Sequence, residues 1–317
     1  MLVYLIRRLL YVVPIALAVS VVCFSLVHIA PGDPLVSVLP PDASQNLVEQ
    51  MRKSYGFDRP LPVQFGIWIG KAIQGDFGTS IATSRPVSQE IYKAVGNTLM
   101  LAMAATLIGF TLGCFFGFVA GYFRDTWIDR VAVTVSILGV SVPHYWLGMV
   151  LVICFSVLLP WLPPTGAGPG SSADWIWNWE HVQYLILPAC TMSVIPMGIV
   201  TRTVRALVGD ILSQEFVDAL RAKGLTDWGV FCHVVKNAAP TALTVIGLQL
   251  GYLLGGSILV EMVFNWPGLG RLLVDAVEMR DYPVIQAEVL LFSLEFILIN
   301  LIVDILYAVI NPTIRYR

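Results

Sequence analysis

A short charged segment between two long apolar runs holds the side chains of this sequence that are best suited to contact another protein. Residues 216–225 read FVDALRAKGL, and Arg221 and Lys223 fall in the last turn of a predicted helix, where positive charge suits the helix dipole. Ser213 is expected to cap that helix at its start, and Gly224 to end it in the left-handed conformation. The pattern predicts a rigid elbow at a membrane surface. A second short helix is expected to begin at Thr226, with an apolar stripe that lies on neighbouring membrane helices: Val230, Phe231, Val234 and Val235.

The last apolar run of the sequence contains carboxylates, which are costly inside a membrane and mark either a transport pathway or a buried ion pair. At about 100° per residue, Glu288 and Glu295 lie within about 20° of each other on one helical face, and Asp304 lies nearly opposite Glu295. Asp304 is near the inner end of the run and is expected to pair with an arginine or to cap backbone groups. Glu295 lies in mid-span, so it is a candidate for a translocation pathway, with Glu288 on the same face. A buried pair is the equal alternative for Glu295.

Sequence motifs of enzymes and metal sites do not match in this chain. Residues 66–71, GIWIGK, resemble a phosphate loop, but three residues separate the glycines where four are needed, and Ala72 replaces the Ser or Thr that would hold magnesium. No nucleophile elbow or zinc-binding helix motif is present in the sequence. His28 and His144 have no second ligand at helical spacing, and the five cysteines lack paired or metal-type spacing. The sequence therefore predicts no catalytic residue and no metal site.

Composition predicts that the elements positioning these residues are membrane helices. Apolar residues make up 57% of the 317 residues and charged residues only 13%, with a mean hydropathy of +0.77, whereas a soluble domain has about 25% charged residues. The first apolar run follows Arg7 and Arg8, and we expect it to be an uncleaved span rather than a signal peptide. The predicted fold is an all-α integral membrane protein with six transmembrane helices. Crossing a bilayer takes roughly 20 residues, and the six runs that suffice are residues 9–30, 98–122, 131–159, 182–204, 241–264 and 284–310.

The distribution of Lys and Arg predicts the orientation of these spans. With the N-terminus inside, the cytoplasmic segments carry eleven such residues, and the short outer loops carry two, Arg271 and Arg280. The outer loop 160–181 has no Lys or Arg and contains four tryptophans, as an outer interfacial belt does. Both termini are therefore expected in the cytoplasm. The eleven inner cations are Arg7, Arg8, Arg124, Arg130, Arg202, Arg205, Arg221, Lys223, Lys236, Arg315 and Arg317.

These assignments divide the chain into four parts. Residues 1–30 are expected to form an N-terminal membrane helix and residues 31–96 an outer, periplasmic segment. That segment has helical patterns at residues 47–55 and 63–73 between proline turns. Residues 97–311 are expected to form a five-helix core with a cytoplasmic loop at 206–239, and residues 312–317 a cytoplasmic tail.

Two ladders of glycines predict close helix packing. Spacing of four residues places the members of each ladder on one helix face, where another helix can approach closely in lipid. The partner helix is expected either within this chain or across a subunit interface. The ladders are Gly109, Gly113, Gly117 and Gly121 in the second span, and Gly247, Gly251 and Gly255 in the fifth.

Six positions in and after the charged segment form a pattern: Asp218, Ala219, Gly224, His233, Asn237 and Pro240. This pattern resembles the cytoplasmic signature loop of permease subunits of bacterial ABC importers, in the dipeptide, oligopeptide and nickel branch. Three later stretches, residues 261–271, 279–286 and 311–315, are similar to the same branch, so the resemblance covers nearly the whole chain. Within the branch, the chain resembles the glutathione import permeases. One departure is Asp218, where the broad signature usually begins with Glu.

The resemblance implies a type I importer permease fold and a set of partners. It implies a homologous second permease, two ATPase subunits that carry ATP and magnesium, and a periplasmic binding protein that delivers a short peptide, with no nucleic acid. The cytoplasmic loop would dock in a cleft of the ATPase through Asp218, Ala219, Arg221, Lys223, Gly224, His233 and Asn237. The candidates for docking of the binding protein on the outer side are Asp33, Asp76, Trp266 and Arg271.

Two other functions remain compatible with the residues alone. A secondary transporter could use an ion gradient through Glu295 and Asp304, and a membrane scaffold would need no transport at all. Under the importer interpretation the chain is a multi-pass protein of the bacterial inner membrane without enzymatic activity of its own.

Overall fold

The computed structural model describes residues 13–22, 24–25, 44–54, 58–171 and 175–310 of the chain. In this described part the regular structure is helical apart from an isolated bridge between Thr79 and Pro86. The chain divides into two compact units. The first comprises Met1–Asn97 and Pro267–Leu298, and the second comprises Thr98–Trp266 and Ile299–Arg317, so the long helices α4 and α11 contribute to both units.

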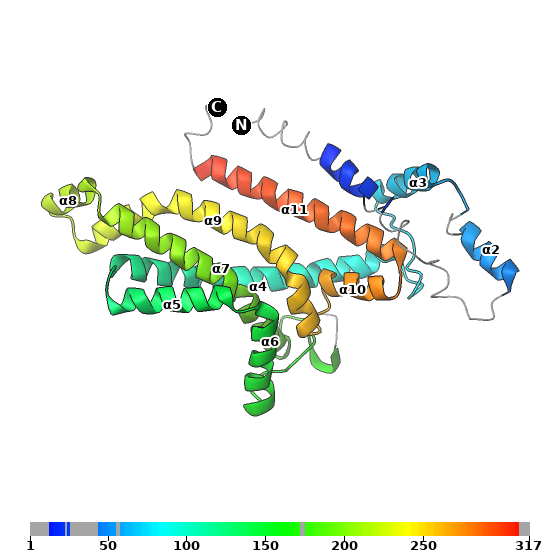
Figure 1. The fold of residues 1–317 in the computed structure, drawn as a ribbon, viewed down its shortest axis with the longest axis horizontal. Helices are drawn as coiled ribbons and strands as arrows, with labels where there is room; N and C mark the ends of the chain where they lie inside the picture. Colours follow the sequence, from blue (N-terminus) through cyan, green and yellow to red (C-terminus); the bar gives the residue numbers. More distant parts are fainter. Residues whose placement is uncertain (1–12, 23, 26–43, 55–57, 172–174, 311–317) are drawn as a thin grey trace. The chain divides into compact units, whose positions relative to one another are not determined.

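The helices follow one another along the chain as labelled in Figure 1, after a short apolar helix at Val13–Val22. Both helical patterns predicted in the outer segment are confirmed, since α2 and α3 cover their described residues. The sequence 66–71 is part of α3 and not a loop, which agrees with its rejection as a phosphate loop. The bounds are α2 Gln45–Ser54, α3 Leu61–Ile73, α4 Val87–Tyr122, α5 Trp127–Ser141, α6 His144–Val152 with a π-helical continuation Ile153–Leu158, α7 Trp179–Leu212, α8 Glu215–Ala222, α9 Asp227–Val263, α10 Leu269–Glu278 and α11 Tyr282–Ile310.

Four of the described helical segments are long and apolar enough to cross a membrane, and a bent pair could make a fifth. The four are Val87–Tyr122, Trp179–Leu212, Asp227–Leu253 and Tyr282–Ile299. The first expected span, residues 9–30, lies partly outside the described residues, and its described helix Val13–Val22 is shorter than a span.

The third expected span, residues 131–159, corresponds to two helical segments joined by a sharp bend. The helical segments Trp127–Ser141 and His144–Leu158 meet at an angle of 99°. Pro143 explains the break, because a proline disfavours the helical conformation of the residue before it. Val142 is accordingly extended, with φ −82° and ψ 128°.

The second unit is organised around α7, which packs against α5, α6 and α9. Here the first glycine ladder is confirmed, because the α4 glycines lie against the backbone of α7. A Cβ atom added at Gly109, Gly113, Gly117 or Gly121 would lie 2.6 to 3.0 Å from a carbonyl oxygen of α7. Those oxygens belong to residues that are also four apart, so the two helices run in register: Ser193, Met197, Thr201 and Arg205.

The second glycine ladder behaves differently along α9. Gly247 and Gly251 are buried, but Gly255 is exposed and no heavy atom of the described chain outside its own helix would lie within 4 Å of an added Cβ. A close helix approach at Gly255 is therefore not made within the described chain, and the predicted approach across a subunit interface stays a prediction.

The first unit has its own apolar core, formed by the start of α4, helix α10 and the start of α11. Val87, Ile91, Leu269, Val284 and Ala287 are each at most 4% exposed in this cluster. Asn97 adds a polar contact, since its side-chain amide donates a 2.9 Å hydrogen bond to the carbonyl of Pro267.

Candidate functional site

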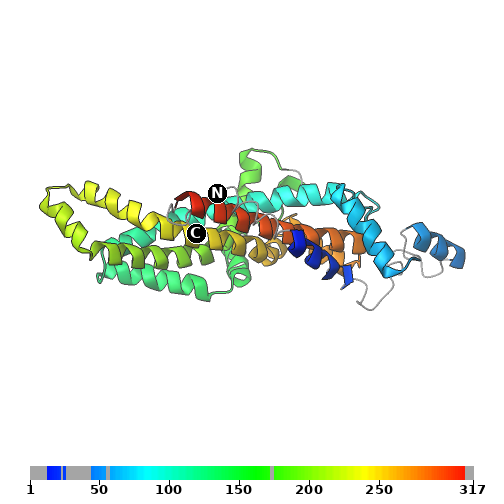
Figure 2. The ribbon, with the colours of Figure 1, turned by 90° about the horizontal axis from the view of Figure 1, so that it is seen from above.

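The charged segment forms helix α8, which connects α7 to α9 within the second unit (Figures 1 and 2). The predicted cap by Ser213 is wrong. Helix α7 continues to Leu212, and the Ser213 hydroxyl donates a 2.8 Å hydrogen bond back to the Asp210 carbonyl. Gln214 is the residue that precedes α8, and its side chain makes no capping bond.

The predicted end of α8 at Gly224 is confirmed. Gly224 has a φ of +82°, in the left-handed region. Its N–H donates to the carbonyl of Arg221 at 2.9 Å, and the N–H of Leu225 donates to the carbonyl of Leu220 at 3.2 Å. These two bonds form a Schellman motif, which satisfies the last carbonyls of the helix and fixes the direction in which the chain leaves it.

One side of α8 is anchored and the other is free to meet a partner. Val217 is fully buried, and Phe216, Leu220 and Leu225 pack partly buried against the core of the second unit. The exposed residues of α8 include a solvated ion pair, with Arg221 and Asp218 3.7 Å apart and their side chains 49% and 80% exposed. Such exposed pairs hold each other weakly, by about 0 to 1 kcal/mol. The predicted site residues Asp218, Ala219, Arg221, Lys223 and Gly224 are all exposed.

The predicted second helix begins where expected, but it is not short: it continues as the long helix α9. The Thr226 hydroxyl oxygen accepts a 3.3 Å hydrogen bond from the N–H of Gly229 and caps α9. The expected boundary before residue 241 is wrong, because α9 runs for 37 residues through Pro240. Pro240 has no N–H, so one backbone hydrogen bond of the helix is missing there. The helix continues because buried residues before and after Pro240, including Val234 and Leu253, hold α9 in place.

The remaining predicted coupling residues lie on the first part of α9. His233 and Asn237 are both exposed, and the side-chain amide of Asn237 donates a 2.9 Å hydrogen bond to the carbonyl of His233. Of the predicted apolar stripe, Val230 and Val234 are buried as expected, whereas Val235 is 40% exposed and does not belong to it.

Sequence reasoning missed Trp228 as part of this surface. Its ring is 70% exposed, yet it stacks on Phe231 with ring centres 4.9 Å apart and an interplanar angle of 13°. Phe231 in turn meets Phe118 edge to face at 4.5 Å. This stack fixes a large aromatic ring next to the charged helix, and tryptophan is among the residues that contribute most to protein interfaces. The signal in the sequence was Trp228 itself, a large aromatic residue between Asp227 and the predicted apolar stripe that begins at Val230.

An ion pair that sequence reasoning also missed lies on the part of α7 that leads into α8. Asp129, whose side chain is 3% exposed, receives two hydrogen bonds from the Arg205 guanidinium, and the one from Nη2 measures 2.6 Å. The carboxylate also accepts a 3.0 Å bond from the N–H of Asp125. This paired geometry ties the start of α5 to α7.

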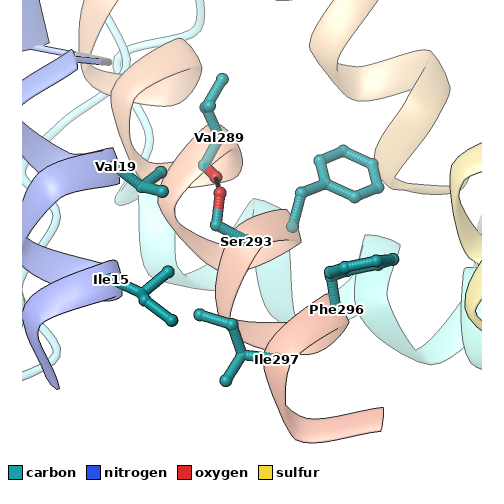
Figure 3. Close-up of a pocket in the computed structure, with 7 residues that line it drawn as sticks. Ile15, Val19, Val289, Ser293, Phe296 and Ile297 are labelled. Carbon is teal, nitrogen blue, oxygen red and sulfur yellow. Dashed lines mark hydrogen bonds between the residues drawn. The ribbon is translucent and has the colours of Figure 1, made fainter. Parts of the chain in front are cut away.

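The pathway candidates Glu288 and Glu295 both belong to the part of α11 in the first unit. Glu288 is fully buried and Glu295 is half-buried. Helix α11 also borders an apolar cleft of about 320 Å³ beside the N-terminal helix, and neither glutamate lines it (Figure 3). The side chain of Asp304 lies outside the described residues. The cleft is lined by Ile15, Val19, Val289, Phe292, Ser293, Phe296 and Ile297.

The candidates for docking of a binding protein differ in exposure. Asp76 is exposed and accepts a 2.9 Å hydrogen bond from the N–H of Gly78. Arg271 is half-buried and lies 3.4 Å from Asp275 on α10. Trp266 is fully buried, so any role in docking would act through the position of its loop. Asp33 lies outside the described residues.

Comparison with known proteins gives consistent matches. Residues 109–316 match the family model described as binding-protein-dependent transport system inner membrane component. Residues 1–102 match the model for the N-terminal part of such membrane components. The glutathione transport system permease proteins GsiC of Escherichia coli strain K12 and of Shigella dysenteriae are each 47% identical to the chain over 318 residues, which covers all of both chains. The protein of that name from Salmonella typhi is also 47% identical over the same length.

Proposed function

The chain belongs to the family of binding-protein-dependent transport system inner membrane components, and we propose that it is the permease through which an ABC importer moves glutathione or a similar short peptide. The family and the relatives make it a multi-pass inner-membrane permease subunit of an ABC peptide importer, without enzymatic activity, rather than a secondary transporter. The observation that carries the choice of substrate is the 47% identity to glutathione transport permeases over the full length of both chains. Dipeptides, oligopeptides and nickel chelates are the other substrates of the branch that the sequence resembles.

Helix α8 is proposed to couple this permease to an ATPase subunit. Its support is the combination of a buried anchor at Val217, an exposed charged side that includes Arg221, and a fixed exit at Gly224. Because α8 is held at these points, a displacement of α8 by the ATPase would move α7 and α9 with little local bending. His233 and Asn237 extend the same contact along α9.

A binding protein and an ATPase are the partners that the family implies. The proposed complex contains this chain, one homologous permease and two ATPase subunits, on which ATP and magnesium bind. Closure of the ATPase pair would move α8 and reorient the two permeases between outward-open and inward-open states. On the outer side, Asp76 and Arg271 are proposed to contact the binding protein, with Trp266 supporting that contact from within and Asp33 as a further candidate.

The orientation proposed for the chain has six spans and both termini in the cytoplasm. The orientation rests on the excess of Lys and Arg in the inner segments. The number of spans rests on the apolar runs of the sequence, of which four to five are recognised as spans in the described residues. Reporter fusions after Arg124 and Gly209 should give a cytoplasmic signal, and fusions after Ser171 and Asp275 a periplasmic one. A periplasmic signal from the Gly209 fusion would exclude contact between α8 and a cytoplasmic ATPase.

Purification of the tagged chain from its own membranes tests the composition of the complex. Native mass spectrometry should find the chain with one homologous permease and two ATPase subunits. Recovery of the intact chain without any ATPase would contradict the proposal.

Cysteine crosslinking tests the proposed contact at α8. The exposed native Cys232 is first replaced by serine, and Ala219→Cys should then form a crosslink to lysine amines of the ATPase with a short maleimide–succinimidyl ester reagent. Thr126→Cys, in an exposed turn before α5, is the matched control. Equal crosslinking at both positions would argue against a specific contact.

A further inference from the structure

A buried carboxylate in the first unit joins two segments that are far apart in the sequence. We propose that Asp281 is a positioning residue, which holds the outer loop before α4 against the turn between α10 and α11 and so fixes the surface that receives the binding protein. The inference rests on the proposed function for the identity of that partner. The joined segments carry two of the docking candidates, since Asp76 lies between α3 and α4 and Arg271 lies on α10.

The Asp281 carboxylate accepts three hydrogen bonds from consecutive residues of the loop. The Ser80 hydroxyl donates to Oδ2 at 2.5 Å, the N–H of Ile81 donates to Oδ1 at 3.1 Å, and the N–H of Ala82 donates to Oδ2 at 3.1 Å. Ser80 is fully buried and Asp281 is 2% exposed. The Ser80 oxygen also accepts a 2.9 Å bond from the N–H of Thr83, which draws the next residue of the loop into the same clamp.

The place of Asp281 in the chain indicates that it serves the loop rather than its own helix. It directly precedes α11, where an aspartate commonly accepts hydrogen bonds from the first N–H groups of its own helix. Here its backbone carbonyl accepts the 3.0 Å bond from Ile285 that starts α11, while its side chain binds the loop.

The backbone next to the clamp adopts a conformation that needs support. Arg280 has a φ of +54°, in the left-handed region that non-glycine residues seldom occupy. The turn is closed by the N–H of Asp281, which donates to the carbonyl of Ala276 at 2.8 Å, and by the N–H of Arg280, which donates to Val277 at 3.2 Å. Residues held in such conformations persist when their surroundings fix them, and the clamp supplies that support.

The loop itself is compact but has little core of its own. Ile81 and Val87 are buried, whereas Thr83, Ser84 and Arg85 are exposed. Without the clamp, the loop between Gly78 and Val87 keeps its internal bonds, such as Val87 N–H to Gly78 carbonyl at 3.0 Å, and one bond to α4, from the Thr83 hydroxyl to the Glu90 carboxylate at 2.7 Å. Loss of the clamp should therefore free this segment while the helical core of the unit remains.

The experiment compares Asp281→Asn with wild type in the complete complex reconstituted in lipid nanodiscs. An amide nitrogen at the Oδ2 position cannot accept the bond from Ala82, so exchange of the Ile81 and Ala82 amide hydrogens should rise at least about tenfold by mass spectrometry. The concentration of liganded binding protein that half-stimulates ATP hydrolysis should rise about fivefold or more, with a smaller change in the maximal rate. Glu278→Gln removes one exposed carboxylate from the neighbouring turn and should change neither quantity.

Ser80→Ala is the second variant, for use if Asp281→Asn fails to assemble. It removes one donor of the clamp and should give smaller changes in the same direction. Faster exchange without a change in the half-stimulating concentration would overturn the positioning role and leave a purely structural clamp. Unchanged exchange in both variants would overturn the clamp itself. If the wild-type complex shows no stimulation by any binding protein, the proposed function fails instead, and the exchange result is unaffected by that failure.

Discussion

Replacement of Gly224 by valine is the perturbation whose effect can be worked out most fully from the structure. The glycine has a φ of +82°, and an added Cβ would meet nothing within 4 Å, so the effect of a side chain there is conformational and not steric crowding. Holding an L-residue in this region costs about 1 to 2 kcal/mol, and more for a β-branched one. If the turn relaxes instead, it gives up the two backbone bonds of the Schellman motif, at about 0.5 to 1.5 kcal/mol each.

Both routes give a penalty of about 1 to 3 kcal/mol, which corresponds to roughly a 5- to 150-fold shift away from the native position of α8. The membrane helices should still insert, because the anchor at Val217 and the core around α7 do not depend on this turn. We therefore expect normal amounts of chain in the membrane with at least fivefold less peptide uptake, through weaker recovery of the ATPase or hydrolysis without uptake.

The assay measures uptake, ATPase recovery and the amount of chain in the same membranes. Gly224→Asn is the matched control, because asparagine adopts the left-handed conformation far more readily than valine and should keep most of the activity. Wild-type uptake and ATPase recovery in Gly224→Val would refute the coupling role of this turn. Equal damage by Asn and Val would refute its conformational explanation.

Three further substitutions, one of them with a matched control, test other parts of the account. Gly117→Val places a Cβ 2.6 Å from a carbonyl oxygen of α7, and this overpacking should destabilise the purified protein by about 1 to 3 kcal/mol in thermal unfolding, whereas Gly255→Ala should have little effect. Arg205→Ala removes the cationic partner of the buried Asp129 carboxylate and should cost about 3 to 5 kcal/mol, measured as a lower unfolding temperature in detergent. Glu295→Gln should change the uptake rate or the range of peptides transported in a normally assembled complex.

Each of these substitutions has an outcome that contradicts the reasoning. An unfolding temperature unchanged by Gly117→Val would mean that α4 and α7 are not in close contact in the membrane. A fully stable Arg205→Ala would mean that water reaches Asp129. Unchanged uptake kinetics in assembled Glu295→Gln would remove this residue from the pathway, and loss of assembly would favour a buried pair.

Local chemistry made the ends of α8 and α9 partly predictable from the sequence. Gly224 and Thr226 act through bonds between residues three to five positions apart, so their types alone indicate a helix end and a helix start. The glycines of α4 were predictable as a ladder because four-residue spacing defines one face of a helix. Their partner was not, since nothing local specifies that the opposing backbone belongs to α7.

Features that depend on distant residues could not be predicted in the same way. The partners Asp129 and Arg205 are 76 positions apart, and Ser80 and Asp281 are 201 positions apart. The two prolines make the same point, because Pro143 breaks its apolar run and Pro240 lies inside a continuous helix. Tertiary packing along α9 keeps the helix continuous at Pro240, and the local sequence pattern does not show that packing.

Uptake of labelled glutathione into proteoliposomes tests the central claim most directly. The vesicles contain the complex purified through the tagged chain, with its binding protein outside and ATP enclosed. We expect uptake that requires both ATP and the binding protein, persists when ionophores dissipate all ion gradients, and falls at least fivefold with Gly224→Val. Uptake that ignores ATP and follows an imposed ion gradient would contradict the account.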